Sequence, residues 1–380
     1  IGDLSIDASR RALEDHFERR GLVADVRPYF LEPGPGKQPQ ATGTFVSRII
    51  PSTMPKMSIV IPCKLGSTTV VGTDTITVLE HCLLSIRESS RDDEKLASNL
   101  PELEIILVLN HEDDIATGDS LISNFDLSGF TLCDEPGFNF SRKCNLGAKH
   151  ASGDIIVFLN DDTAFESRGW TSHVISLLEE DDVACVGGLL LNSDRTVQSC
   201  GDNVGRNSAV HYAPNRSAAS VGDQMHRYIA DHETTAITGA FFCCKKQTYE
   251  DLGGFSLAFP NSFQDVDFCL RARQKQMRCL VSPHIRLLHF ESVSRNPKVD
   301  DETLTLIRHV HVSTMGPIDP FALWAYEIPQ PRIFSRPGVR HYLAVAKRTI
   351  WRIAFIGLIY MKPGPSHPRR VLDRKEWRVH

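Results

Sequence analysis

The sequence lacks several features that define other classes of protein. No apolar run approaches the roughly 18 residues that a membrane-spanning helix needs, and no secretory signal is visible. The formal net charge is -5, whereas a dedicated nucleic-acid binder usually carries a basic excess. Neither an internal repeat nor a low-complexity tract is present. We therefore expect a cytoplasmic protein that is not embedded in a membrane and has no nucleic-acid partner.

The sequence also lacks any Cys-x-x-Cys pair, although it contains ten cysteines. Several of these lie inside apolar runs, as in Phe241-Phe242-Cys243-Cys244. A zinc site or a disulfide framework is the functional interpretation of so many cysteines. Reduced thiols buried in the core of a protein from a reducing compartment are the structural interpretation, and it is the one that we expect.

The pattern of the chain predicts three regions. These are an N-terminal α+β lead-in over residues 1–55, a central domain over residues 56–298, and a helical, basic C-terminal region over residues 299–380. In the lead-in, Asp7 or Ser9 is a candidate cap for a helix that Gly21 ends. Two extended stretches, residues 24–30 and 42–50, follow that helix. A further helix is predicted over residues 300–312.

The central domain reads as strands that alternate with helices. Residues 58–62, 103–110 and 155–159 are short apolar runs of the kind that forms strands buried on both faces. Helices are predicted between them, over residues 75–87 and around residues 145–150. This alternation predicts an α/β fold with a mostly parallel sheet flanked by helices.

Ligands of such sheets bind beyond the carboxyl ends of the strands. Attention therefore falls on Pro62, on Asn110 and on the run Asn160-Asp161-Asp162. Two adjacent carboxylates repel each other and raise each other's pKa unless a cation joins them. Mg²⁺ and Mn²⁺ prefer oxygen ligands and often share them with substrate phosphates. The alternative is a polar turn that caps a helix.

A second acidic pair lies at the predicted start of a helix. Phe263, Val266 and Leu270 are spaced as the apolar stripe of that helix, and Asp265 and Asp267 are expected to point away from it. A carboxylate at a helix start is stabilised by the helix dipole and is a candidate general base. The alternative is an ordinary helix start with two solvated acids.

A single histidine ends a short predicted strand over residues 285–288. His289 is more simply a satisfied surface or core residue, but a neutral imidazole also completes carboxylate metal sites.

These motifs, in their order along the chain, resemble a family 2 glycosyltransferase of GT-A fold. The matching motifs over residues 56–298 are Ser58-Ile-Val-Ile-Pro62, Phe138-Asn139-Phe140-Ser141, Asn145-x-Gly147, Asn160-Asp161-Asp162-Thr163, Val183 to Leu191, Gln198-Ser199-Cys200-Gly201, Thr238-Gly239-Ala240, Leu252-Gly253-Gly254-Phe255, Gln264-Asp265-Val266-Asp267, His289 and Ser294-Arg295.

The resemblance implies a role for each matching site residue. Asp265 would be the catalytic base, and Asp162 and His289 would bind a divalent metal, Mn²⁺ or Mg²⁺. Asn160 and Asp161 would line the sugar and ribose side of the donor, and Pro62, Asn110 and Asn145 would border the nucleoside. The chain departs from the family in reading Asn-Asp-Asp where Asp-x-Asp is usual, and Gln264-Asp265 where Glu-Asp is usual.

The activity implied by the resemblance is inverting transfer of a hexosyl or deoxyhexosyl group. The donor would be a nucleoside-diphosphate sugar, and the acceptor a hydroxyl of a glycan or lipid-linked glycan in cell-surface polysaccharide synthesis. Two alternatives stay open. One is a nucleotidyltransferase or other sugar-nucleotide enzyme of similar fold, and the other is a non-catalytic glycan- or nucleotide-binding scaffold with a relict site.

The C-terminal region is a candidate membrane-surface segment. From His341 to Met361 aliphatic residues and Trp351 alternate with basic residues, and an Arg- and Lys-rich tail follows. Such a helix can lie on an anionic bilayer at the inner face of the membrane, where each nearby cation contributes about 1 kcal/mol. The alternatives are a helix packed on the catalytic domain and a contact between subunits of an oligomer.

We predict that the full chain co-sediments with anionic vesicles in a salt-sensitive manner, because the basic side chains would bind the lipid headgroups. A chain that ends near Pro337 should stay in the supernatant. Equal, salt-insensitive recovery of both proteins in the supernatant would refute the membrane role.

Overall fold

The computed structural model describes residues 3–31, 40–71, 73–90, 100–135, 137–205, 208–211, 216–217, 227–290, 301–311 and 319–321. The candidate membrane-surface segment, residues 341–361, and the basic tail lie outside these ranges. In the described part of the chain, no helix combines the length and the apolar character needed to cross a bilayer. The boundaries proposed at residues 55 and 298 stay predictions.

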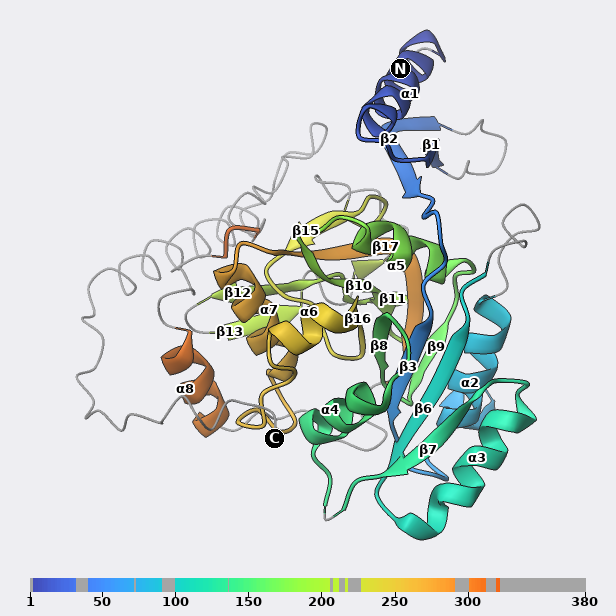
Figure 1. Cartoon of the computed structure of the whole chain (residues 1–380), viewed down its shortest axis with the longest axis vertical. Helices are drawn as coiled ribbons and strands as arrows, with labels where there is room; N and C mark the ends of the chain where they lie inside the picture. The colour runs from blue at the N-terminus through green and yellow to red at the C-terminus, as the bar shows by residue number, and fades with distance from the viewer. Residues whose placement is uncertain are drawn as a thin grey trace, which may run out of the picture.

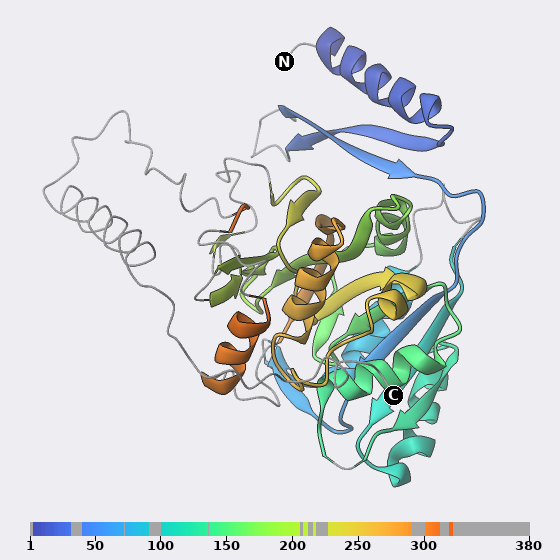
Figure 2. The ribbon, with the colours of Figure 1, turned by 60° about the vertical axis from the view of Figure 1, so that its left-hand side comes forward.

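The N-terminal residues form a small α/β unit at one end of the molecule (Figures 1 and 2). It consists of helix α1 (Asp3–Arg19) and the antiparallel strands β1 (Ala24–Leu31) and β2 (Gln40–Ile49). The helix begins before both predicted capping residues, and Gly21 follows its end with a φ of 70°. Contacts between the unit and the rest of the chain include the pair of Arg20 with Glu180 at 2.8 Å and the hydrogen bond from the Ile49 N–H to Ser176 Oγ at 2.7 Å.

The centre of the molecule is one large mixed sheet. In the described residues its path runs β14-β11-β10-β16-β8-β3-β6-β7, and β17 joins it beside β10. Its strands are β3 (Met57–Pro62), β6 (Leu103–Leu109), β7 (Gly129–Cys133), β8 (Ile155–Leu159), β9 (Thr163–Phe165), β10 (Val183–Leu191), β11 (Thr196–Ser199), β14 (Arg216–Ser217), β15 (His232–Thr234), β16 (Phe241–Lys245) and β17 (Arg278–His289). Two small hairpins stand apart: β4 (Thr68–Val71) with β5 (Asp74–Thr77), and β12 (Asp202–Gly205) with β13 (Ser208–His211).

The three strands predicted to be buried, β3, β6 and β8, are parallel neighbours in the middle of this sheet. Strand β3 pairs in parallel with β6 on one side and with β8 on the other, so that Ile59 lies between Ile105 and Val157. Every residue of β3 and β8 is buried. Aliphatic side chains on both faces suit this position, because helices cover both faces of the sheet.

The helices divide into two layers, one on each face. The described helices besides α1 are α2 (Val78–Ser89), η1 (Glu112–Asp114), α3 (Ile115–Asn124), α4 (Phe140–His150), α5 (Trp170–Leu178), α6 (Lys246–Asp251), α7 (Gln264–Gln274) and α8 (Asp301–Val310). Side chains of α2, α3 and α5 pack into one core cluster, and those of α4, α6 and α7 into the other. The predicted α/β class with a mostly parallel sheet flanked by helices is confirmed.

One predicted helix begins later than expected. Residues 75–87 were predicted to be helical, but Asp74–Thr77 form strand β5, and α2 begins at Val78. The β-branched side chains of Thr75, Ile76 and Thr77 favour a strand, and β4 supplies the partner that the pattern alone does not reveal.

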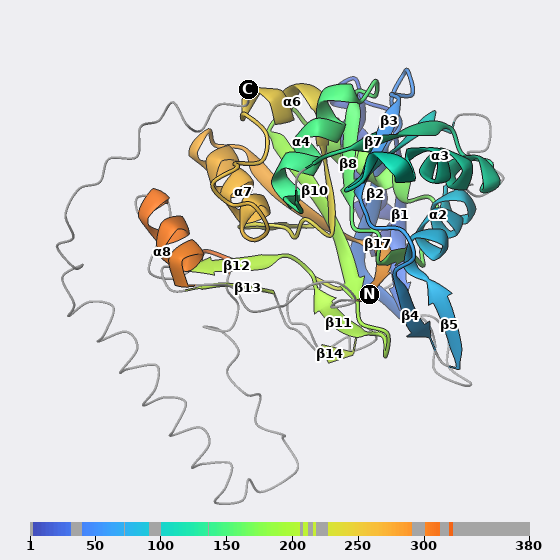
Figure 3. The ribbon, with the colours of Figure 1, turned by 90° about the horizontal axis from the view of Figure 1, so that it is seen from below.

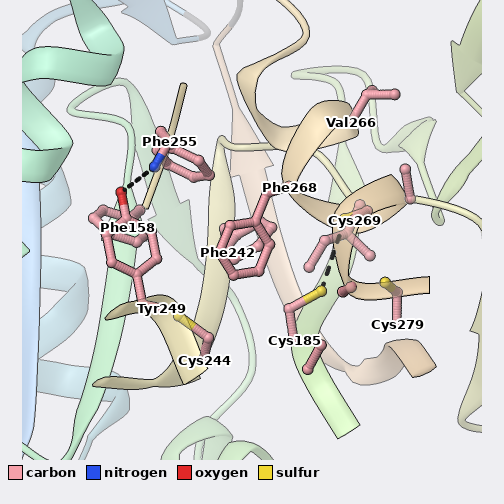
Figure 4. Packing of buried hydrophobic residues seen from close by; sticks show 14 of the residues in the cluster. Phe158, Cys185, Phe242, Cys244, Tyr249, Phe255, Val266, Phe268, Cys269 and Cys279 are labelled. Carbon is pink, nitrogen blue, oxygen red and sulfur yellow. Dashed lines mark hydrogen bonds between the residues drawn. The ribbon is translucent and has the colours of Figure 1, made fainter. Parts of the chain in front are cut away.

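The core under α6 and α7 is rich in aromatic rings and thiols (Figure 4). Phe158 lies 4.9 Å, between ring centroids, from both Tyr249 and Phe255, and Phe242 meets Phe268 edge to face at 5.2 Å. All ten cysteines are free, nine are buried, and Cys133 is half-buried. The predicted burial of thiols in the core is therefore confirmed, and no disulfide framework is present among these ten described cysteines.

The prediction for Asp267 is wrong. This side chain is fully buried instead of pointing away from the core. Its Oδ2 lies 2.8 Å from an Arg271 guanidinium nitrogen, and its Oδ1 lies 2.8 Å from Nε2 of the equally buried His311. His311 directly follows α8, which lies beside α7 in Figure 3. The charge is therefore satisfied by Arg271, one turn further along α7, and by His311, which the sequence pattern does not connect with Asp267.

We predict that His311→Ala lowers the free energy of unfolding by about 1–3 kcal/mol, because it leaves one oxygen of the buried Asp267 carboxylate without a donor. His309→Ala, at an exposed position of the same helix, is the matched control and should change it by less than about 0.5 kcal/mol. Denaturant unfolding of both variants measures the difference, and equal stabilities would contradict the buried pair.

Candidate functional site

The predicted site residues meet at the carboxyl edge of the parallel strands. Pro62 ends β3, Asn110 directly follows β6, and Asn160 directly follows β8. Because these three strands are parallel neighbours, their ends lie at the same edge of the sheet.

The two adjacent carboxylates after β8 have different environments. Asp161 is half-buried, and its Oδ2 accepts a hydrogen bond from the backbone N–H of Lys64 at 3.2 Å. Burial, followed by the charge of Asp162, raises the pKa of Asp161 to about 7. Asp162 is 8% exposed, and its Oδ1 accepts no hydrogen bond from the described residues.

Strand β17 brings His289 to this edge. It pairs antiparallel with β9, placing His289 opposite Thr163, and the Phe290 N–H donates to the Asp162 carbonyl at 2.9 Å. His289 Nε2 consequently lies 3.2 Å from Asp162 Oδ1 and 3.2 Å from Asn160 Nδ2. The predicted strand exists, but it is longer than expected and begins at Arg278.

The hydrogen bonds of His289 define its tautomer. Nδ1 lies 2.6 Å from the amide oxygen of Gln198, which can only accept, so Nδ1 carries the proton. Asn160 Nδ2 can only donate, so Nε2 presents its lone pair. The same nitrogen lies 3.2 Å from the unpaired Oδ1 of Asp162. Such an imidazole, fixed through its other nitrogen, is how proteins present histidine to a metal.

The pair formed by Asp162 and His289 fits a divalent cation. Two neighbouring ligands of an octahedral ion with bonds of about 2.1 Å lie roughly 3 Å apart, close to the observed 3.2 Å. Placing a cation between them also removes the repulsion between two facing lone pairs. The residues present at this edge are therefore suited to Mn²⁺ or Mg²⁺.

Asp265 lies in the first turn of α7 and is anchored by backbone donors. Its Oδ2 accepts from the Gly239 N–H at 2.6 Å, and its Oδ1 accepts from the Val266 N–H at 2.8 Å. Burial is the main cause that raises the pKa of the Asp265 carboxyl, and the charge of Asp202 adds to it. A half-buried carboxylate with a raised pKa is a stronger base than an ordinary aspartate.

One short turn is hydrogen-bonded both to the acidic run after β8 and to the carboxylate of Asp265. The Asn160 N–H donates to the carbonyl of Ala240 at 3.0 Å, while the preceding Gly239 gives its N–H to Asp265. The predicted metal-binding run and the predicted base are therefore held by adjacent residues, although they are about a hundred positions apart in the sequence.

The residues predicted to border the nucleoside have different environments. Asn110 has a buried Oδ1 with no partner in the described part of the chain, which leaves it available for a ligand. The amide of Asn145, in contrast, is used within the protein. It accepts from the Tyr249 hydroxyl at 2.6 Å and from the Phe255 N–H at 3.0 Å, and it donates to the Phe255 carbonyl at 2.8 Å. This geometry gives Asn145 a structural role and does not support a nucleoside contact.

Two neighbours of the site were not identified from the sequence. Gln198, which orients His289, stands in the sequence only within the motif Gln198-Ser199-Cys200-Gly201, and no motif marks Asp202, whose charge helps to raise the pKa of Asp265. No spacing could have revealed them, because they lie 91 and 63 positions from their partners.

The sequence is similar to those of two curated proteins. The chain is 27% identical over 294 residues to the O-antigen biosynthesis protein RfbC of Myxococcus xanthus, covering 77% of this chain and 21% of that protein. It is 26% identical over 294 residues to the uncharacterized protein y4gI of Sinorhizobium fredii, covering 76% and 29%. The chain therefore spans less than a third of the length of these relatives.

Among solved structures, the chain is similar to GalNAc-T7 with UDP, GalNAc and Mn²⁺. The TM-score is 0.50 at 15% identity, covering 68% of this chain and 48% of that chain. At this identity the likeness concerns the fold alone.

The sheet and its flanking helices have the GT-A fold. Residues 58–212 match the model of glycosyl transferase family 2. The resemblance inferred from the motifs is therefore confirmed.

We predict that Asp162→Ala and His289→Ala each weaken Mn²⁺-dependent binding of a nucleoside diphosphate at least tenfold, because both side chains would share one ion. Asp119→Ala and His150→Ala, at exposed positions, are the matched controls and should bind as the unchanged protein does. Calorimetric titration with and without Mn²⁺ measures these affinities. Loss of binding in only one of the two site variants would argue against a shared ion.

Proposed function

We propose that this chain is an inverting glycosyltransferase that moves a sugar from a nucleoside-diphosphate sugar to a hydroxyl of a glycan acceptor. One observation carries the proposal. The facing pair of Asp162 and His289, suited to a divalent cation, and the anchored carboxylate of Asp265 are connected through the turn at Gly239 and Ala240. Asp162 and His289 would thus act on the donor, and Asp265 would act on the acceptor.

In the proposed reaction Asp265 acts on the acceptor. Its carboxylate takes the proton of an acceptor hydroxyl while that oxygen attacks the anomeric carbon from the face opposite the leaving group. The bond between the anomeric carbon and the diphosphate breaks, and its electron pair leaves with the nucleoside diphosphate. The configuration at the anomeric carbon is thereby inverted. A divalent ion, when bound, neutralises charge that develops on the diphosphate.

The remaining residues of the edge would bind the donor. Asn110, with its unpartnered buried oxygen, would contact the nucleoside, and Pro62, at the end of β3, would border it. Asn160 and Asp161 would line the sugar and ribose side. Positioning of this kind supplies much of the rate enhancement in such reactions.

The relatives indicate a class of acceptor. One of them is named for O-antigen biosynthesis, and the similar solved structure contains UDP, GalNAc and Mn²⁺. We infer a hexosyl or deoxyhexosyl donor, a lipid-linked or cell-surface polysaccharide acceptor, and a cytoplasmic site of action.

Incubating the full chain with a panel of nucleotide sugars, Mn²⁺ and nitrophenyl glycosides tests the proposal. We expect release of a nucleoside diphosphate and a new glycosidic bond. A nucleotidyltransferase would release pyrophosphate instead. A relict scaffold would bind nucleotide and release neither product.

We predict that Asp265→Asn lowers the transfer rate about 10²–10⁴-fold, because the amide cannot take the acceptor proton. Binding of the nucleoside diphosphate should stay close to that of the unchanged protein, since the base contacts the acceptor. Turnover of the variant within tenfold of the unchanged protein would show that Asp265 is not the base.

The pH dependence of transfer should report the same carboxyl. Only the ionised form is a base, so activity is present above the pKa of Asp265 and is lost as the pH falls through it. Because this pKa is raised above the ordinary value of 3.8, the acid limb should lie above pH 3.8.

Asp202→Asn removes the nearby charge, so we predict that it moves this acid limb to lower pH. Asp181→Asn, at a fully exposed position, is the control and should leave the limb in place. An unchanged limb in Asp202→Asn would assign it to another group.

A further inference from the structure

Three buried thiols come together in the core beneath α7. Cys185 lies on β10, Cys269 on α7 and Cys279 on β17, and none of the three is exposed to solvent. Figure 4 shows them near one another on three different elements. The parallel pairing of β10 with β17 puts Cys185 directly beside Cys279, and α7 crosses above both.

The distances between the sulfurs are those of a metal thiolate site. Cys185 Sγ lies 3.8 Å from Cys269 Sγ, and all three sulfurs lie within 4.8 Å of one another. Sulfurs bound to one ion through bonds of about 2.3 Å are separated by roughly 3.8 Å in a tetrahedral site and roughly 4.0 Å in a trigonal one. An ion would therefore need only a small contraction of the cluster.

The ligand set of the cluster consists of three sulfur atoms. Soft sulfur ligands select thiophilic ions such as Cu⁺ and Zn²⁺ over Mg²⁺ or Mn²⁺.

We propose that Cys185, Cys269 and Cys279 form a second metal site, distinct from the catalytic edge, that binds one thiophilic ion such as Zn²⁺ or Cu⁺. Binding replaces the thiol protons, which pass to solvent, and involves no change of oxidation state. In the described residues no carboxylate or imidazole joins the three sulfurs, so the site is a tris-thiolate site. Because the cluster is buried, the ion enters while the chain folds.

The proposed site has a structural consequence for the catalytic edge. Cys269 follows Asp265 by about one helical turn on α7, and Cys279 lies on the strand that ends at His289. One ion would therefore connect the helix of the proposed base with the strand of the proposed metal-binding histidine. This inference does not depend on the proposed transfer reaction.

Cadmium is a suitable probe, because cadmium thiolates absorb in the ultraviolet. The full chain with Cys133→Ser, which removes the half-buried thiol, is refolded under reducing conditions with and without Cd²⁺. We expect one equivalent of Cd²⁺ per chain, the thiolate absorption band and a higher melting temperature. Cys269→Ser and Cys279→Ser in this background should lose the band. Cys244→Ser, equally buried but outside the cluster, is the matched control and should keep it.

Metal analysis of the protein purified without added metal distinguishes the physiological ions, with about one equivalent of zinc or of copper per chain as the expected result. The absence of a thiolate band in the refolded parent protein would overturn the proposal. So would a band that persists in Cys269→Ser and Cys279→Ser, or one that Cys244→Ser abolishes equally.

Discussion

The proposed site at the carboxyl edge of the parallel strands depends on two backbone hydrogen bonds made by the turn that precedes β16. Gly239 donates to the carboxylate of Asp265, and Ala240 accepts from the N–H of Asn160. Because β16 runs antiparallel to β8, this turn necessarily lies at the carboxyl end of β8, where the acidic run begins. These two hydrogen bonds thus set the position of the proposed base, Asp265, relative to Asp161 and Asp162. Backbone groups suit this task, since they have no rotamers to lose.

A few contacts likewise position His289. Its backbone is placed by the pairing of β17 with β9, and its ring is oriented by Gln198 of strand β11. Nε2 of the imidazole then lies 3.2 Å from the unpaired Oδ1 of Asp162. These two electron-rich atoms repel each other in an empty site and would be favourable ligands around a cation. The arrangement of Asp162 and His289 therefore favours a bound cation.

Outside this edge, the molecule is held together by two apolar layers and a few buried polar contacts. The pair of Asp267 and His311 joins α8 to α7, and the amide of Asn145 holds the turn at Phe255. The first of these contacts involves α7, the helix that also carries Asp265. Polar residues that resemble functional ones in the sequence can thus be structural, because a buried backbone turn needs donors and acceptors as much as a ligand does.

The sequence by itself indicated the central strands and the family resemblance. Runs such as Ile155 to Leu159 are apolar on both faces, which suits strands of a sheet that helices cover on both sides, so the fold class could be predicted. It also led to the proposed roles of Asp162, Asp265 and His289, because each lies at or near the end of an element. The tertiary structure alone decided which of the polar residues share a site, since Gln198, His311 and the thiols of the core meet partners far away in the chain. Local patterns record how a segment faces solvent or core, whereas contacts between distant segments are set by how the strands pair.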